Sequence, residues 1–170
     1  MNPTGPPERV RWAVERLDVQ PSDEILEIGC GPGQAAWLVC EHLRDGHLTA
    51  IDRSAVAIER ASRRNAEHVA AGRVRFLRVA LADLDADPAR YDKAFAVNVN
   101  AFWTGPARAE LEVLDRVIRP GGAVHLVYEA PPGGQERDVA GAVDEALARH
   151  GFAVEVARGA GVLCITGRHR

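Results

Sequence analysis

Two spacings of hydrophobic residues alternate along the chain. Short apolar runs bounded by turn-forming residues predict strands, and they cover residues 24–28, 48–51, 74–79, 94–97 and 123–128. Segments with apolar residues on one face at helical spacing predict helices, and they cover residues 8–17, 34–44, 54–68, 107–118 and 139–150. Near the end, two runs at residues 152–157 and 162–166 flank a Gly-Ala-Gly turn, which predicts an antiparallel hairpin.

This alternation of strands and helices predicts the fold class. Strands separated by helices form right-handed βαβ units and therefore a mainly parallel sheet. The closing hairpin adds one antiparallel strand. Ligands bind such sheets beyond the carboxyl ends of the strands, so we expect the functional site at that edge.

Composition narrows the class of protein further. The chain has 170 residues, 46% hydrophobic and 26% charged, which fits one globular domain over residues 8–170 after a flexible arm at residues 1–7. It contains no apolar run of membrane-spanning length and no signal-peptide pattern, so we expect a cytoplasmic protein without a membrane partner. The net charge of −3 disfavours a general nucleic-acid binder. The spacing of Cys30, Cys40 and Cys164 matches no zinc pattern, so we expect small buried thiols and no metal site.

The most informative segment is a glycine-rich loop that follows the first strand directly. Gly29, Gly31 and Gly33 permit a tight turn and let a ligand approach the backbone, although an ordinary strand-to-helix turn uses the same residues. Asp52 lies 21 residues after Gly31, at the end of the next strand, where a carboxylate can bind ribose hydroxyls or cap a helix. The two features together favour nucleoside binding. Gln34 stands where the dinucleotide fingerprint has its third glycine, so a nucleoside without phosphate, such as S-adenosylmethionine, fits better than a nicotinamide cofactor.

Four segments in this order resemble the class I S-adenosylmethionine-dependent methyltransferases, and they are residues 27–33, 50–54, 91–98 and 114–122. The resemblance implies an α/β fold, a three-layer αβα sandwich around a doubly wound, mainly parallel seven-strand sheet. The implied strand order is 3-2-1-4-5-7-6 with the last strand antiparallel. S-adenosylmethionine would be the co-substrate and S-adenosylhomocysteine the product.

The resemblance also implies a set of cofactor-binding residues, which are Glu27, Gly29, Gly31, Gln34, Asp52, Arg53, Ala80, Leu81, Ala82 and Asn98. Glu27 would orient the ammonium group of the methionine part, unless it is a solvated carboxylate at a strand end. Asp52 would bind the ribose, Arg53 would flank the adenine or lie on the surface, and Asn98 would meet the ammonium group.

The sequence departs from the family pattern after the third strand. Ala80 stands where the family often has an aspartate that accepts a hydrogen bond from the adenine amino group. Recognition of adenine would then pass to the backbone of residues 80–82 and to apolar contact from Leu81. Asp83 is an alternative partner, although its position suggests a loop or a helix cap.

The expected acceptor pocket follows the fourth and fifth strands. Candidates for catalytic residues are Asn100, Trp103, Tyr128 and Glu129, with Asn98 and Phe102 as further wall residues. Phe102 could equally pack the next helix, and His125 fits a core histidine better than a base. A base is needed only if the acceptor must lose a proton early.

The function we expect is methyl transfer to an O, N, C or S atom of a small-molecule acceptor. Two alternatives stay open: a protein or RNA methyltransferase that acts with a partner subunit, and a non-catalytic subunit that binds S-adenosylmethionine. Motifs of DNA methyltransferases are lacking, so we expect no DNA partner. The arginines at positions 60, 63 and 64 interleave with acidic residues and suggest a solvated helix face rather than an RNA site. A homodimer is an open possibility.

Overall fold

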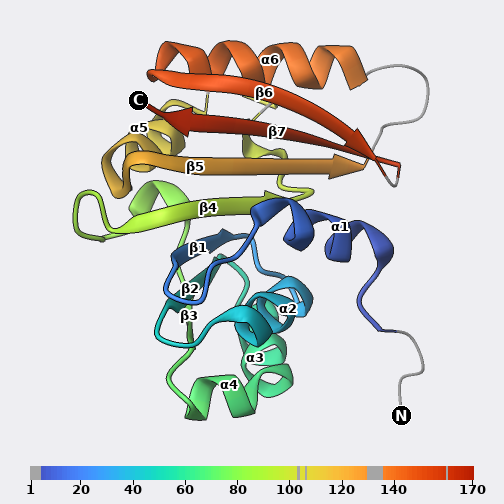
Figure 1. Cartoon of the computed structure of the whole chain (residues 1–170), viewed down its shortest axis with the longest axis vertical. Coiled ribbons are helices and arrows are strands. Elements are labelled where there is room, and N and C mark those ends of the chain that lie inside the picture. Colours follow the sequence, from blue (N-terminus) through green and yellow to red (C-terminus); the bar gives the residue numbers. More distant parts are fainter. Residues whose placement is uncertain (1–4, 103, 106, 130–135, 160) are drawn as a thin grey trace.

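A seven-stranded sheet runs through the protein in the order β3-β2-β1-β4-β5-β7-β6 (Figure 1). The computed structural model describes residues 5–102, 104–105, 107–129, 136–159 and 161–170. The strands are β1 Glu24–Ile28, β2 His47–Asp52, β3 Val74–Arg78, β4 Tyr91–Val97, β5 Ile118–Glu129, β6 Phe152–Gly159 and β7 Val162–His169. Strands β3, β2, β1, β4 and β5 are parallel, and β7 is antiparallel to both β5 and β6. The predicted strand order and the antiparallel last strand are therefore confirmed.

Helices cover both faces of this sheet and complete the three expected layers. They are α1 Glu8–Leu17, α2 Gln34–His42, α3 Ala55–Arg64, α4 Ala66–Ala70, α5 Arg108–Val117 and α6 Glu136–Arg149, with short 3-10 helices η1 Leu81–Asp83 and η2 Asn100–Phe102. Buried residues of α1, α2 and α3 join one core cluster, and those of α5 and α6 join the other. Figure 1 shows α6 running along β6 and β7. Successive side chains of a strand point to opposite faces, so each inner strand contributes to both cores.

Of the expected N-terminal arm, residues 1–4 lie outside the described residues. Pro7 already belongs to the start of α1, because its carbonyl accepts hydrogen bonds from the backbone N–H groups of Val10 and Arg11 at 2.9 and 3.1 Å. None of the helices within the described ranges has the length and apolar character needed to cross a membrane.

Several predicted element boundaries differ from the structure, and two of the differences have a clear local reason. The helix predicted over residues 54–68 divides into α3 and α4 at Asn65, whose side-chain amide donates to the carbonyl oxygens of Ala61 and Gly33 at 2.9 and 3.0 Å. The fifth strand begins at Ile118 rather than at residue 123, because the predicted turn at residues 119–122 is an irregularity inside the strand, opposite Asp92.

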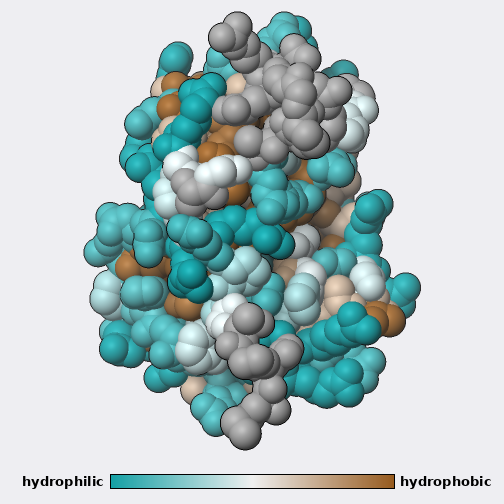
Figure 2. Space-filling view, turned by 90° about the vertical axis from the view of Figure 1, so that its right-hand side faces the viewer, coloured by the Kyte–Doolittle hydropathy of each residue, from teal (hydrophilic) through white to brown (hydrophobic). Residues whose placement is uncertain are grey.

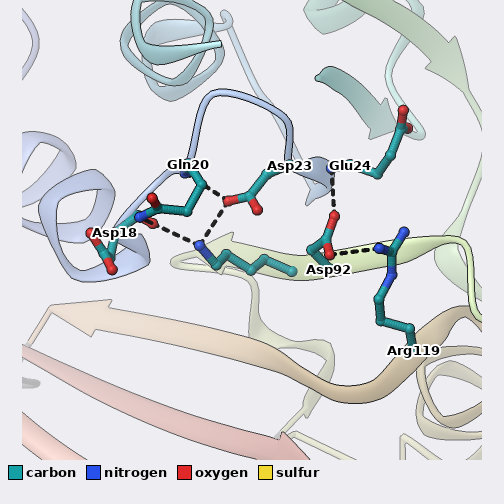
Figure 3. Close-up of polar contacts among 7 residues, drawn as sticks. Asp18, Gln20, Asp23, Glu24, Asp92 and Arg119 are labelled. Atoms are coloured by element: carbon teal, nitrogen blue, oxygen red, sulfur yellow. Dashed lines mark hydrogen bonds and ion pairs between the residues drawn. The ribbon is translucent and has the colours of Figure 1, made fainter. Parts of the chain in front are cut away.

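The amino-terminal ends of the strands carry a network of charged side chains (Figure 3). Lys93, the only lysine, contacts Asp23 Oδ2 and the Asp18 carbonyl, each at 2.7 Å. Asp92 accepts from the Glu24 backbone at 2.8 Å and pairs with Arg119 at 2.8 Å. These contacts tie α1, β1, β4 and β5 together at the edge opposite the strand carboxyl ends, where no chemistry was predicted.

Candidate functional site

A cavity of about 590 Å³ opens at the carboxyl ends of β1, β2, β3 and β4, as the sheet topology predicts. Its wall consists of Ile28, Gly29, Ile51, Asp52, Arg53, Val79, Ala80, Leu81, Val97, Asn98, Val99, Asn100, Ala101, Phe102, Thr104 and Glu110. The volume lies within the range of roughly 300–1,000 Å³ that is typical of small-molecule sites. Figure 2 looks onto this edge of the molecule, which is mainly hydrophilic with smaller apolar areas between the polar residues.

The glycine loop between β1 and α2 forms one side of this edge. Gly29, Gly31 and Gly33 all have positive φ angles, of 69°, 51° and 75°, which favour glycine. The backbone N–H groups of Gly29 and Cys30 donate to the Ile51 carbonyl at 2.8 and 3.0 Å, so the loop folds over the end of β2. This turn places the start of α2 beside the carboxyl end of the sheet.

Asp52 is held at the end of β2 by two backbone donors. Its Oδ2 accepts from Gly31 N at 3.0 Å, and its Oδ1 accepts from Ser54 N at 2.8 Å. Each carboxylate oxygen has a second lone pair for a ligand. The carboxylate therefore lines the cavity in a fixed orientation, and Ser54 itself caps α3 by accepting from Ala57 N at 3.2 Å.

Glu27 is a buried carboxyl group whose side chain lacks a protein partner for Oε2. The residue is only 4% exposed, and its register neighbours on β2 and β4 are the apolar Ala50 and Phe95. Burial, with a further contribution from the charge of Asp52, raises the pKa of Glu27 from 4.5 to about 8. The structure thus contradicts the alternative of a solvated strand-end carboxylate. An unpaired buried carboxyl group beside the glycine loop is suited to a cationic ligand group.

Asn98 connects the ends of β4 and β5. It has a positive φ of 56°, and its side chain forms two hydrogen bonds with Glu129: Nδ2 donates to Oε2 at 3.1 Å, and Oδ1 accepts from Glu129 N at 2.8 Å. Arg9 of α1 pairs with the same Glu129 carboxylate at 3.3 Å. This network fixes the turn by which the chain leaves β4 and enters the cavity wall.

The structure brings six of the ten predicted cofactor residues into the cavity wall: Gly29, Asp52, Arg53, Ala80, Leu81 and Asn98. The other four, Glu27, Gly31, Gln34 and Ala82, do not belong to the wall. Gly31 donates to Asp52 of the wall, and the charge of Asp52 contributes to the raised pKa of Glu27, whereas Gln34 lies in the first turn of α2 and Ala82 is exposed in η1.

The candidates for the acceptor side are divided. Asn100 lines the cavity, as does Phe102, which is also part of the core. Tyr128 lies in the core cluster outside the cavity wall, and burial raises the pKa of its phenol well above the ordinary value of 10. Glu129 is not a wall residue, but it is hydrogen-bonded to the wall residue Asn98. Trp103 lies outside the described residues.

Two polar wall residues, Thr104 and Glu110, were not predicted from the sequence. Thr104 belongs to the segment after η2, and its hydroxyl donates to the Asn100 carbonyl at 2.9 Å. Glu110 lies in the first turn of α5. The one available signal was that α5 is the first α-helix after β4, so its first turn returns to the carboxyl edge of the sheet.

His125 and the cysteines take the structural positions expected for them. His125 is buried, contacts Thr166 Oγ1 through Nδ1 at 3.2 Å, and has a pKa lowered to about 4 by burial and by the positive charge of Lys93. Cys30, Cys40 and Cys164 are free and buried. Within the described ranges, no three His, Cys, Asp or Glu side chains are arranged to hold a metal ion.

The sheet order, the glycine loop after β1 and the fixed acidic residue after β2 define the class of α/β proteins that bind S-adenosylmethionine. The family model of the methyltransferase domain matches residues 25–122, more than half of the chain, from β1 into the first part of β5. The chain belongs to this family, the class I S-adenosylmethionine-dependent methyltransferases, whose methyl donor is S-adenosylmethionine.

Named relatives and solved structures agree with this assignment. The chain is 29% identical over 119 residues to the uncharacterized methyltransferase YdaC of Bacillus subtilis, covering 70% of this chain and 63% of that protein. It is 35% identical over 103 residues to a malonyl-[acyl-carrier protein] O-methyltransferase of Salmonella typhimurium, covering 59% of this chain and 36% of that protein. The fold is similar to that of a SAM-dependent methyltransferase from Aquifex aeolicus, with a TM-score of 0.79 at 16% identity over 95% of this chain and 89% of the other. The chain thus spans less than two thirds of the length of these curated relatives.

Proposed function

We propose that this protein transfers the methyl group of S-adenosylmethionine to a nucleophilic atom of a small-molecule acceptor. The observation that carries the proposal is the cavity at the carboxyl ends of β1 to β4, where Asp52 is held in place beside the glycine loop. Glu27 precedes the wall residue Ile28 on β1 and is buried without a partner for Oε2. These groups match the two polar ends of a nucleoside that carries an amino acid.

The residues present fit such a ligand. The free lone pairs of the Asp52 carboxylate can accept hydrogen bonds from two ribose hydroxyls. Glu27 can compensate an ammonium group, which would remove the desolvation cost of its ionised form. Leu81 and Val79, which line the cavity as Arg53 does, provide apolar surface for a planar base.

When bound, the donor supplies a methyl group on a positively charged sulfur, which is already activated for displacement. The protein therefore mainly positions the reactants. The acceptor lone pair forms a bond to the methyl carbon while the carbon–sulfur bond breaks. The electron pair of the broken bond stays on sulfur, which becomes neutral. Asn98, Asn100 and Thr104 are the polar groups of the wall after β4 that can orient the acceptor.

The size of the cavity supports a small acceptor. About 590 Å³ must hold the donor and the reacting part of the acceptor together. The relative from Salmonella typhimurium is a malonyl-[acyl-carrier protein] O-methyltransferase, which supports an acceptor with a small reacting part.

The test is calorimetry of S-adenosylhomocysteine binding to wild type, Asp52→Ala and Asp85→Asn. We expect micromolar binding by wild type and by Asp85→Asn, which alters an exposed acidic residue outside the cavity wall. Asp52→Ala should weaken binding more than tenfold, because it removes charge-assisted hydrogen bonds. Folded wild-type protein that binds neither donor nor product would refute the proposal.

Turnover distinguishes the remaining alternatives. Transfer of a labelled methyl group to members of a small-molecule acceptor panel supports the proposed acceptor class. Binding without transfer to any small acceptor, but with transfer to a protein or RNA when a partner subunit is added, would replace it by the partner-dependent reading.

A further inference from the structure

Glu110 is a second carboxylate in the cavity wall, on a different element from Asp52. Asp52 and Glu110 are the acidic residues among the described wall residues. The Asp52 carboxylate accepts hydrogen bonds from two backbone N–H groups. The Glu110 side chain makes no hydrogen bond or ion pair with any residue that the structure describes. Its side chain is half-buried, so it is removed from part of its solvent without a protein partner.

The packing of α5 determines which part of the cavity Glu110 faces. Residues three and four apart share a helix face, so Glu110 shares a face with Val113 and Leu114, both buried residues of α5. Val113 belongs to the same core cluster as Leu81 and Leu84. Arg116 donates to the Leu84 carbonyl at 3.1 Å and also to the Ala86 carbonyl.

This face of α5 is therefore packed against the segment that follows β3, and α5 directly contacts η1. Glu110, Ala80 and Leu81 all line the cavity, and the contact between α5 and η1 brings Glu110 towards the end formed by Ala80 and Leu81, beyond the ribose position at Asp52. In a nucleoside bound through its ribose at Asp52, the base lies at that end.

The position of Glu110 in the first turn of α5 does not by itself explain this arrangement. An acidic residue near a helix N-terminus is favourable wherever it points. Glu112, in the same part of the helix, is exposed and pairs with Arg108 at 2.8 Å. Glu110 differs because it is directed into the cavity wall and has no such partner.

We propose that Glu110 determines base specificity in the donor site: its carboxylate accepts a hydrogen bond from the exocyclic amino group of adenine. The inference rests on the proposed function. A carboxylate is an acceptor only, so it favours a base with an amino group at this position. It disfavours a base that has a carbonyl oxygen there, since two acceptors would face each other. Neither Ala80 nor the exposed Asp83, which lies outside the wall, supplies a side chain with this property.

The experiment compares S-adenosylhomocysteine with S-inosylhomocysteine, in which a carbonyl replaces the amino group. Dissociation constants of both are measured by calorimetry for wild type, Glu110→Ala, Glu110→Gln and the matched control Glu112→Ala. Thermal unfolding of each variant confirms that it is folded.

We expect wild type and Glu112→Ala to prefer the adenine ligand by about tenfold or more, the effect of one charge-assisted hydrogen bond. Glu110→Ala should reduce this ratio at least fivefold, mainly by weaker binding of the adenine ligand. Glu110→Gln should bring the two affinities close together, because an amide can accept from an amino group or donate to a carbonyl.

An adenine preference that is the same in Glu110→Ala as in wild type overturns the inference. The same holds if Glu110→Ala keeps the ratio but raises KM for the methyl acceptor, since Glu110 would then face the acceptor. Both results leave binding of S-adenosylhomocysteine intact, so they are distinct from failure of the proposed function, in which wild type binds neither ligand.

Discussion

Substitution of Glu27 by glutamine tests the electrostatics of the donor site. The change keeps the size and shape of the side chain and removes its ionisation. Because the pKa of Glu27 in the folded protein is about 8, well above its ordinary 4.5, the folded state holds a proton that the unfolded chain has lost between these values. The stability of ligand-free wild type should therefore be fully present below about pH 4.5 and fall as the pH rises towards 8.

The magnitude follows from the size of the shift. A difference of 3.5 pKa units corresponds to roughly 5 kcal/mol at 1.36 kcal/mol per unit. This is an upper limit, since water can enter a site with an ionised group. Between pH 6 and 8, the stability of Glu27→Gln relative to wild type should rise by about 2 kcal/mol.

Ligand binding provides the second part of the test. At pH 7 a carboxyl group with a pKa of about 8 is protonated in roughly nine molecules of ten. An ammonium group placed beside it favours the ionised form, so binding of S-adenosylhomocysteine should release close to one proton from wild type. Glu27→Gln should lack this release and bind the ligand more weakly.

The assays are urea unfolding at several pH values and calorimetry in buffers with different ionisation enthalpies. Glu24→Gln is the control, because Glu24 lies at the opposite end of the same strand and pairs with Arg90 at 3.1 Å. Parallel pH profiles for wild type and Glu27→Gln would show that burial does not raise the pKa. Equal proton release by the two proteins would show that Glu27 does not meet the ammonium group.

Three further predictions concern the surrounding structure. Gly33→Ala should cost about 2–4 kcal/mol in urea unfolding, because φ is 75° and a Cβ atom would lie 2.9 Å from Ala61 Cα; a cost below 1 kcal/mol would contradict this. Asn98→Ala should lower the free energy of unfolding by about 1–2 kcal/mol, because it removes both hydrogen bonds to Glu129. Glu129→Ala should lower it by less than half as much, because the backbone N–H at position 129 still donates to Asn98 Oδ1, and equal losses would refute this role of the Asn98 side chain. Burial lowers the pKa of His125 from 6.5 to about 4 in the folded protein. The free energy of unfolding of wild type, measured with urea, should therefore fall by about 2 kcal/mol as the pH is lowered from 6.5 to 5, and that of His125→Gln should fall less.

The fold was predictable because its signals are local and repeated. The parallel strands are short and mainly apolar, and each except β3, which only the 3-10 helix η1 follows before β4, is followed by an α-helix with one apolar face. The errors arose where a single side chain decides the outcome. Asn65 ends α3 by donating to two carbonyl oxygens, one of them Gly33 O from 32 residues earlier, and no local pattern announces that contact.

The site was predictable where position in the chain fixes position in space. A residue at the end of a parallel strand must lie at the carboxyl edge, which explains why Asp52, Ala80 and Asn98 all reach the cavity. The face that a buried strand residue takes is harder to predict, since β5 is apolar on both sides. Tyr128 shares the face of Leu126, which packs into the core with α5 and α6. Glu110 depends on the rotation of α5, which long-range packing determines.

The three glycines of the loop show why such a motif is weak as an isolated signal. A Cβ atom at Gly29 would lie 2.6 Å from Val99 Cγ2, and one at Gly33 would collide with Ala61, so both positions are required by the packing of the protein itself. At Gly31 a Cβ atom would meet nothing within 4 Å, and the backbone N–H of this residue is bonded to Asp52. Only Gly31 therefore leaves open space next to the acidic residue. The packing of this protein accounts for Gly29 and Gly33, whereas the hydrogen bond from Gly31 N–H to Asp52 links the loop to the acidic residue of the cavity wall.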